Sequence, residues 1–129
     1  MFQQIMELIT ICHVIPGFHS CIFVESKENR DSVFEQLIDI VKLYKSEITC
    51  TRCSKLEGRI DFSNGSFIYV RTINNGSRRR YHKILCDSSV KDTDWFNQIA
   101  HSYIMPFYFM DAVELIDLDG GYERSNQNF

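Results

Sequence analysis

Three consecutive arginines, Arg78-Arg79-Arg80, are the side chains of this sequence best suited to contact a polyanion. They follow a Gly76-Ser77 turn, and a guanidinium group matches a phosphate group with paired hydrogen bonds. The pattern predicts weak, salt-sensitive contact with nucleic acid, against the alternative of a solvated turn that binds nothing. Further candidates for this site, as cations or as rings that stack on bases, are Arg71, His82, Lys83, Tyr69 and Tyr81.

Asp87 is the candidate metal ligand. It follows the short apolar run Lys83–Cys86, which predicts a buried strand. An aspartate at the end of such a strand can hold a metal ion, with Ser88 or Ser89 as a hydroxyl ligand. We favour the alternative that Asp87 caps the following helix, because the sequence supplies no phosphate partner for the metal.

The cysteines predict free thiols. Their number is odd, and no basic region precedes the first apolar stretch as it would in a signal peptide, so we expect a reducing cytosol. Cys50 and Cys53 form a lone C-x-x-C, and a structural zinc site needs more ligands than one such pair supplies. We therefore expect no metal there and no cofactor in the chain. The five cysteines are Cys12, Cys21, Cys50, Cys53 and Cys86.

A predicted β-hairpin precedes the arginines. Ile60 and Phe62 alternate with charged residues, and residues 67–73 are rich in β-branched and aromatic side chains. The Asn64-Gly65 pair between them tolerates positive φ at both positions, which predicts a type I′ turn. A nuclease site at Asp61 is disfavoured, because the partner strand offers no Glu-x-Lys.

The wider pattern predicts an α/β fold, a small two-layer or three-layer sandwich with a mixed sheet. Short apolar runs at 20–25 and 112–117 predict strands besides the hairpin, while 46–57 is ambiguous. We expect three or four strands in the sheet, partly parallel. Apolar residues at spacings of three and four predict helices packed on the sheet at 2–13, 31–45 and 92–104.

Length and composition limit the function classes. Residues 1–118 suffice for a single domain, and the polar residues 119–129 predict a flexible tail. The net charge of −3 means that nucleic-acid binding must come from a local patch. No apolar run reaches the roughly 18 residues of a membrane span, so we expect a cytoplasmic protein with no membrane contact.

The hairpin and the strand that ends at Asp87 resemble the ATPase core of phage terminase large subunits, the DNA-packaging motors. In that family a strand, a phrase like F-x-N-G-S-x-I and a second strand precede a Gly/Ser/Arg-rich turn. A hydrophobic strand then ends in Asp-Glu. This chain has FSNGSFI at 62–68, GSRRR at 76–80 and ILCD at 84–87. The resemblance covers about residues 18–106 and implies a βα unit of a parallel sheet.

Two departures from that family concern catalysis. Ser88 follows Asp87, where the family has a glutamate that positions the attacking water. The sequence also has no G-x-x-x-x-G-K-[ST] phosphate loop. The resemblance thus implies a truncated or repurposed protein that is not an enzyme and acts by binding DNA or a motor or other protein partner.

A second class of function is a small phage-encoded inhibitor of a host defence protein, similar to an anti-CRISPR protein. Such an inhibitor would act through protein–protein contacts in the host cytoplasm. The small size, the aromatic content of 13% and the acidic C-terminal segment fit this class equally well. Mimicry of DNA is excluded, because it would need far more acid than a net charge of −3.

Overall fold

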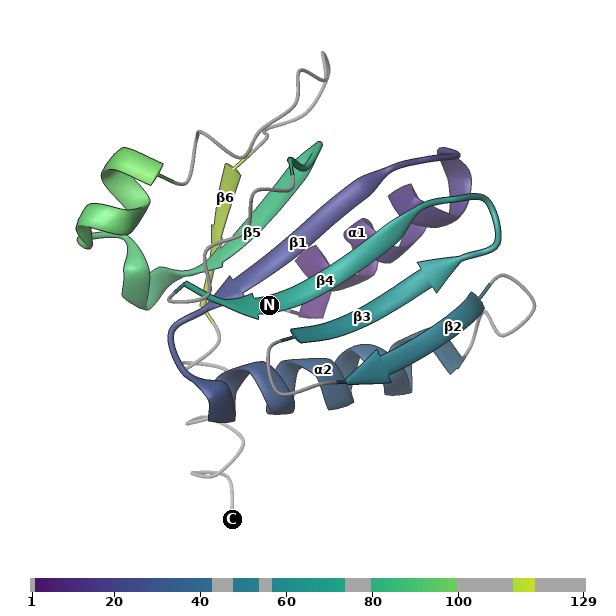
Figure 1. Ribbon diagram of the computed structural model, residues 1–129, viewed down its shortest axis with the longest axis horizontal. Coiled ribbons are helices and arrows are strands. Elements are labelled where there is room, and N and C mark those ends of the chain that lie inside the picture. The colour runs from purple at the N-terminus through teal and green to yellow at the C-terminus, as the bar shows by residue number, and fades with distance from the viewer. Residues whose placement is uncertain (1, 43–47, 54–56, 74–79, 100–112, 118–129) are drawn as a thin grey trace.

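The structure is a computed structural model, and its centre is a six-stranded mixed sheet in the order β2-β3-β4-β1-β5-β6 (Figure 1). It describes residues 2–42, 48–53, 57–73, 80–99 and 113–117. The elements are α1 (Phe2–Val14), β1 (His19–Val24), α2 (Lys27–Val41), β2 (Ile48–Cys53), β3 (Glu57–Phe62), β4 (Phe67–Thr72), β5 (Lys83–Asp87), the 3₁₀ turn η2 (Ser88–Val90), the π-helical turn η3 (Trp95–Ile99) and β6 (Val113–Ile116).

Strand β1 lies between two parallel neighbours, β4 and β5. Strand β6 continues the parallel part beyond β5, and β3 and β2 extend the sheet in antiparallel fashion beyond β4. Residues 20–24 of β1 are all buried, since both faces of this strand are covered. A strand buried on both faces has a continuous apolar sequence rather than an alternating one, which is the pattern observed here.

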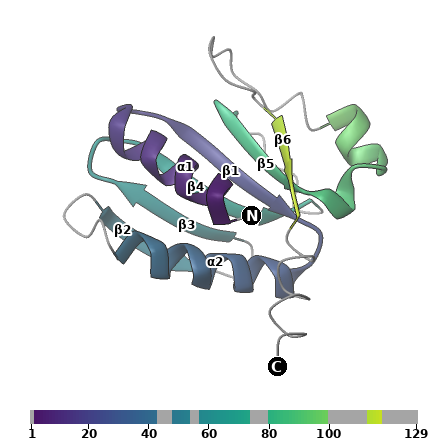
Figure 2. The same cartoon turned by 180° about the vertical axis from the view of Figure 1, so that it is seen from behind.

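Helices α1 and α2 cover one face of the sheet (Figures 1 and 2). Their apolar stripes pack on inward-facing residues of β1, β3, β4 and β5 in the larger of two apolar clusters. Gly58 of β3 lies directly under Phe34 of α2, where a Cβ atom would come within 2.3 Å of the ring. The position therefore requires glycine, and the absent side chain lets the helix approach the sheet closely.

The opposite face carries the second apolar cluster. Phe23, Phe67 and Tyr69 from the sheet meet Val90 and Trp95, which lie on the η2 and η3 turns. The sheet is thus covered on both sides, by two helices on one and by the segment around η2 and η3 on the other. The predicted α/β sandwich with a mixed sheet is confirmed.

The expected number of strands, three or four, is too small, because β2 and β6 both belong to one six-stranded sheet. The ambiguous region 46–57 contributes β2 at one end of this sheet, and the run at 112–117 contributes β6 at the other. Both strands lie at an end of the sheet and pair on one side only, so their sequence signals are weaker than that of the fully buried β1. The predicted tail, 119–129, lies outside the described residues.

Two of the predicted helix boundaries need correction. Helix α2 runs from Lys27 to Val41 rather than over 31–45, because Ser26 is its N-cap and its hydroxyl accepts a hydrogen bond from the Asn29 N–H at 3.2 Å. The predicted 92–104 helix begins later than expected, because residues 94–99 are the helical ones and Trp95–Ile99 are π-helical, after the separate 3₁₀ helix η2. The rest of the predicted 92–104 helix lies outside the described residues. Helix α1 agrees with its prediction.

The β3–β4 turn is not type I′. A type I′ turn needs positive φ at both Asn64 and Gly65. Gly65 has φ of 88°, but every described residue with positive φ is a glycine, so Asn64 does not have positive φ. The Gly65 N–H donates to the Phe62 carbonyl at 3.1 Å, and the Phe62 N–H donates to the Ser66 carbonyl at 2.9 Å. These bonds define a three-residue loop, a type I turn followed by a left-handed glycine.

The same loop holds the end of α1. The Asn64 side-chain amide donates to the carbonyls of Cys12 at 2.9 Å and His13 at 3.3 Å, which are among the carbonyls left unpaired at a helix C-terminus. The Ser66 hydroxyl donates to the Ile15 carbonyl at 2.8 Å and accepts from the Phe18 N–H at 3.0 Å. Asn64 and Ser66 therefore fasten the hairpin to the α1–β1 connection. We call residues 63–66 the SNGS loop.

We expect Asn64→Ala to lower the free energy of unfolding by about 2 kcal/mol, because it leaves carbonyls of α1 without a donor. Asn64→Asp should cost at least as much, since it removes the donor and places a negative charge at the negative end of the α1 dipole. Urea unfolding measures both, with the exposed Asn97→Ala as the control. An Asn64→Ala variant as stable as the control would contradict the capping role.

Candidate functional site

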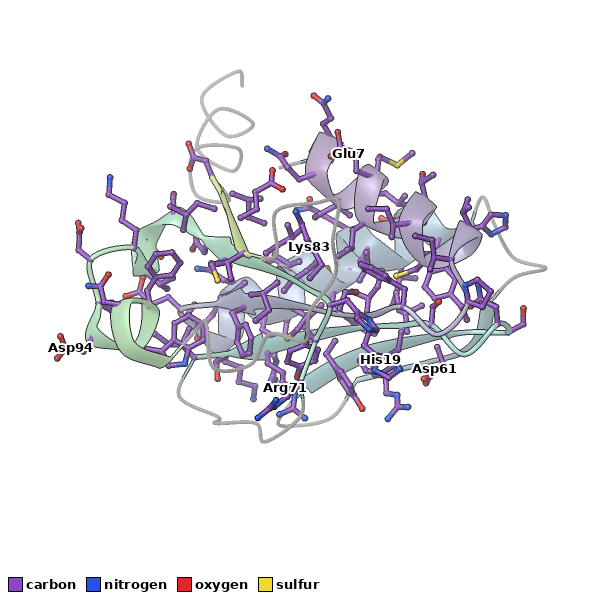
Figure 3. All side chains as sticks on the ribbon, turned by 90° about the horizontal axis from the view of Figure 1, so that it is seen from above. Glu7, His19, Asp61, Arg71, Lys83 and Asp94 are labelled. Carbon is purple, nitrogen blue, oxygen red and sulfur yellow. The ribbon has the colours of Figure 1, made fainter. Side chains whose placement is uncertain are left out.

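Two arginines lie over one tyrosine on the sheet face opposite α1 and α2. Arg59 of β3 is directly opposite Tyr69 of β4 in the strand register, and its Cζ is 4.9 Å from the centre of the tyrosine ring. Arg71, two residues further along β4, places its Cζ 5.0 Å from the same centre. Cations at these distances from a ring are attracted by its π electrons. Figure 3 shows Arg71 on the side of the sheet away from Glu7 of α1.

Arg59 is held in place by Asp61, its neighbour on the same face of β3. The Arg59 Nε is 3.0 Å from Oδ1 and 2.8 Å from Oδ2 of the Asp61 carboxylate. The Arg59 Nη2 is 2.8 Å from Oδ1. The other guanidinium nitrogen, Nη1, donates to the Tyr69 hydroxyl. Asp61 thus compensates most of the Arg59 charge, and Arg59 serves to position Tyr69. The Asp61 carboxylate, where the sequence analysis disfavoured a nuclease site, is occupied by this ion pair.

The prediction that the Tyr69 and Tyr81 rings stack on bases is wrong. Tyr69 is 1% exposed and Tyr81 is 0% exposed, so neither ring surface is open to a ligand. Both rings instead pack edge-to-face, with each other at 6.4 Å and with Phe67 at 4.8 and 6.4 Å. Tyr69 and Tyr81 both belong to the second apolar cluster, which buries their rings. The Arg59 and Arg71 guanidinium groups lie over Tyr69.

Arg80 is exposed and directly precedes Tyr81, which is buried in the second apolar cluster. The buried tyrosine anchors the chain immediately after the arginine-rich turn. Arg78 and Arg79 lie outside the described residues, so their part of the prediction is untested. We call Arg59 and Arg71, which both lie over the Tyr69 ring, the arginine face, and the exposed Arg80 is a further candidate cation in the segment before β5.

Lys83 does not join the arginine face. Its Nζ is 2.8 Å from a carboxylate oxygen of Glu114 on β6, and its side chain is 9% exposed. Figure 3 places Lys83 toward α1, on the other side of the sheet from Arg71 and His19. Side chains of a strand alternate between faces, and Lys83 faces the helices. It fastens β6 to β5 and leaves the candidate site with one cation fewer than expected.

Asp87 is buried at the end of β5 and is the N-cap of η2. Its carboxylate accepts hydrogen bonds from the Ser89 hydroxyl at 2.9 Å and the Ser89 N–H at 3.4 Å. The favoured alternative to a metal ligand, a capping aspartate, is therefore confirmed. Within the described residues no group of three or more potential metal ligands comes together.

Three of the cysteines are buried free thiols: Cys12, Cys21 and Cys86. Burial raises the pKa of Cys12 to about 12, a shift that a contact with the Ser20 hydroxyl only partly offsets. Burial, with a smaller contribution from the Asp87 charge, raises the pKa of Cys86 to about 12. Thiols with such pKa values are poor nucleophiles near neutral pH. The side chains of Cys50 and Cys53 lie outside the described part of the structure.

The sequence analysis missed Arg59 as a member of the site. The available signal was the pairing of 59 with 69 across the hairpin, but a two-residue turn at Asn64-Gly65 would place Arg59 opposite Val70. The three-residue loop shifts the register by one and brings Arg59 opposite Tyr69. The number of residues in the β3–β4 loop therefore decides which residues form the site.

Comparison with protein families, with curated proteins and with solved structures finds no match for this chain. Among the helices that the structure describes, none combines the length and apolar character needed to cross a membrane.

The Lys83–Glu114 pair supports a test of where Lys83 belongs. We expect Glu114→Gln to lower the free energy of unfolding by about 1–2 kcal/mol, because it leaves the buried ammonium without its carboxylate. Adding Lys83→Met should recover most of that loss, since no charge is then buried. A double-mutant cycle by urea unfolding measures the coupling. Additive effects of the two substitutions would contradict the pairing.

We expect Cys12, Cys21 and Cys86 to react with an alkylating reagent at pH 8 at least about 100-fold more slowly in the folded protein than in denaturant, because burial blocks access and the raised pKa values of Cys12 and Cys86 suppress the thiolate. Peptide mapping by mass spectrometry gives the rate for each thiol. Modification of any of the three at its unfolded-state rate would refute this.

Proposed function

We propose that this chain is a non-catalytic binding protein whose arginine face, together with Arg80, contacts the phosphate groups of nucleic acid. The observation that carries the proposal is the pair of arginines held over Tyr69. Arg71 lies on the ring of a fully buried tyrosine, and the exposed Arg80 follows closely in the chain. A guanidinium that is already oriented by a ring loses less freedom when it binds a phosphate.

The chemistry of the face favours contact with the phosphate backbone over reading of bases. Guanidinium groups supply paired donors for phosphate oxygens. The aromatic rings that would stack on bases lie beneath the surface, because Phe67, Tyr69 and Tyr81 are all buried. Binding of this kind is independent of sequence and weakens steeply as the salt concentration rises.

The resemblance to a terminase ATPase core has two kinds of support in the fold. Strand β1 and helix α2 form a βα unit, and β5 lies parallel beside β1 and ends at Asp87. The hairpin precedes β5 in the order that the resemblance implies. The SNGS loop also has a purely structural role in holding α1, so its sequence alone does not distinguish a relative of that family.

We propose a non-catalytic role because the catalytic elements of that family are missing from this sequence. There is no phosphate loop, and Ser88 stands where the glutamate would be. The Asp87 carboxylate is buried and engaged with Ser89. A carboxylate that caps a turn in this way is not presented to a nucleotide-bound metal ion.

The alternative function is inhibition of a host defence protein through protein–protein contacts. The feature that favours it is β6, an end strand of the sheet on which Leu115 is 37% exposed. End strands offer backbone groups and alternate side chains to an added strand of a partner. Under this alternative the arginines accelerate association with an acidic partner instead of binding nucleic acid.

The salt dependence of duplex DNA binding tests the proposal. We expect fluorescence anisotropy with a short labelled duplex to show binding that weakens with salt. Arg80→Ala should reduce the slope of log affinity against log salt by about 0.9, the value for one lost phosphate contact. Replacement of Arg78, Arg79 and Arg80 together should reduce it by roughly three units. Arg71→Ala should also reduce it.

The matched control is Lys42→Ala, which removes an exposed cation at the C-terminal end of α2. It should leave the slope unchanged, because α2 covers the opposite face of the sheet. A wild-type protein without salt-dependent DNA binding would refute the proposal. So would an equal loss in Lys42→Ala, because the effect would then reflect net charge alone. Slower association of the arginine variants with a protein target would favour the inhibitor.

A further inference from the structure

The segment that begins at Arg80 is joined to β1 by two reciprocal hydrogen bonds between His19 and His82. The backbone N–H of His82 donates to the His19 carbonyl at 2.8 Å. The backbone N–H of His19 donates to the imidazole Nδ1 of His82 at 3.0 Å. We call these two bonds the histidine contact. Nδ1 can accept a hydrogen bond only in a neutral imidazole whose proton is on Nε2.

Aromatic rings surround the histidine contact. The His82 ring stacks on Phe18 with centroids 5.2 Å apart, and the His19 ring stacks on Phe67 at 4.3 Å. The two imidazoles are themselves 5.4 Å apart. Burial lowers the pKa of His82 from its ordinary value of 6.5, which favours the neutral form that the hydrogen bond requires.

The charged neighbours of His82 on its own segment are cationic. Arg80 precedes it and Lys83 follows it, with the Lys83 ammonium paired to Glu114 toward the helices. On β1 the titratable neighbour is His19, whose own ring stacks on Phe67 of β4, and the α1–β1 connection contributes the Phe18 ring that stacks on His82. The contacts of His82 with the Phe18 ring and the second imidazole, together with its partial burial, disfavour an added proton.

We propose that the histidine contact is an acid-sensitive attachment of the arginine-bearing segment. A proton taken from solvent by the His82 Nδ1 replaces the acceptor with a donor. The His19 N–H then loses its partner, and the attachment of His82 to the start of β1 weakens, while Tyr81 stays buried in the second apolar cluster. This behaviour is independent of nucleic-acid binding. If the proposed function holds, the same event regulates how Arg80 is presented.

The direction of the pH effect follows from the lowered pKa of His82. The attachment is complete above pH 6.5, where His82 is neutral in both the attached and the detached state. As the pH falls below 6.5, the detached state binds a proton more readily than the attached state, so the attachment weakens. The weakening ends below the lowered pKa, where both states are protonated.

Hydrogen exchange of the His19 amide tests the proposal directly. We expect its protection, corrected for the intrinsic exchange rate, to fall by about tenfold per pH unit in the window below pH 6.5. His82→Asn should remove this dependence, because the side-chain amide oxygen of asparagine can accept from the same N–H and does not titrate. His82→Leu removes the acceptor and should give low protection at every pH.

Two further variants separate His82 from the other histidines. His19→Asn removes the neighbouring imidazole but keeps the backbone donor, and His13→Asn changes a histidine of α1 outside the contact. Both should retain the pH dependence. Loss of the dependence in His19→Asn, or its persistence in His82→Asn, would overturn the proposal. DNA binding is measured separately, so absence of DNA binding would refute the proposed function without affecting this result.

Discussion

The complete burial of β1 is the constraint on which the rest of the structure depends. This strand pairs on both edges, with β4 and with β5, and its side chains contribute to the apolar clusters on both faces of the sheet. A parallel strand cannot follow its neighbour through a tight turn, so each connection must cross a face. Helix α2 and the strands β2 and β3 therefore occupy the path from β1 to β4. The second cluster forms where the chain continues past β5.

The loop between β3 and β4 connects the position of β1 to the position of the arginine face. Asn64 and Ser66 bond to the carbonyls at the end of α1 and just after it, so the loop is fixed relative to β1. The loop length then sets the hairpin register and places Arg59 opposite Tyr69. A shift of one residue would turn the other side of β3 outward. The helix cap and the candidate binding surface are thus parts of one arrangement.

The arginines of this protein have opposite electrostatic tasks. Arg59 is neutralised by Asp61 and orders the aromatic layer, whereas Arg80 is exposed to solvent. Tyr69 joins Arg59 to Arg71, because both guanidinium groups lie over its ring. Because the rings are buried, the surface offers guanidinium groups to a ligand, which suits phosphate contact and does not suit base stacking. The histidine contact joins the segment that carries Arg80 to the same central strand.

Local sequence patterns determined the positions of several elements. The spacing of apolar residues located α1, β1 and the hairpin, and the missing phosphate loop and glutamate argued against nucleotide hydrolysis. The position of Asp87 at a strand end also suggested its role as a cap. These features depend on a few consecutive residues, whose periodicity and hydrogen-bonding preferences act over one or two turns of chain.

Tertiary structure decided the features that depend on which face of each strand is covered. The turn type followed from the bonds between Asn64 and α1, and the hairpin register followed from the turn. Lys83 faces the helices because β5 continues the alternation set by its pairing with β1, so it pairs with Glu114 instead of the arginines. Tyr69 and Tyr81 are buried because the second cluster covers them. Sequence alone identifies a cation or a ring, but burial and register assign it a partner, because both arise from residues far apart in the chain.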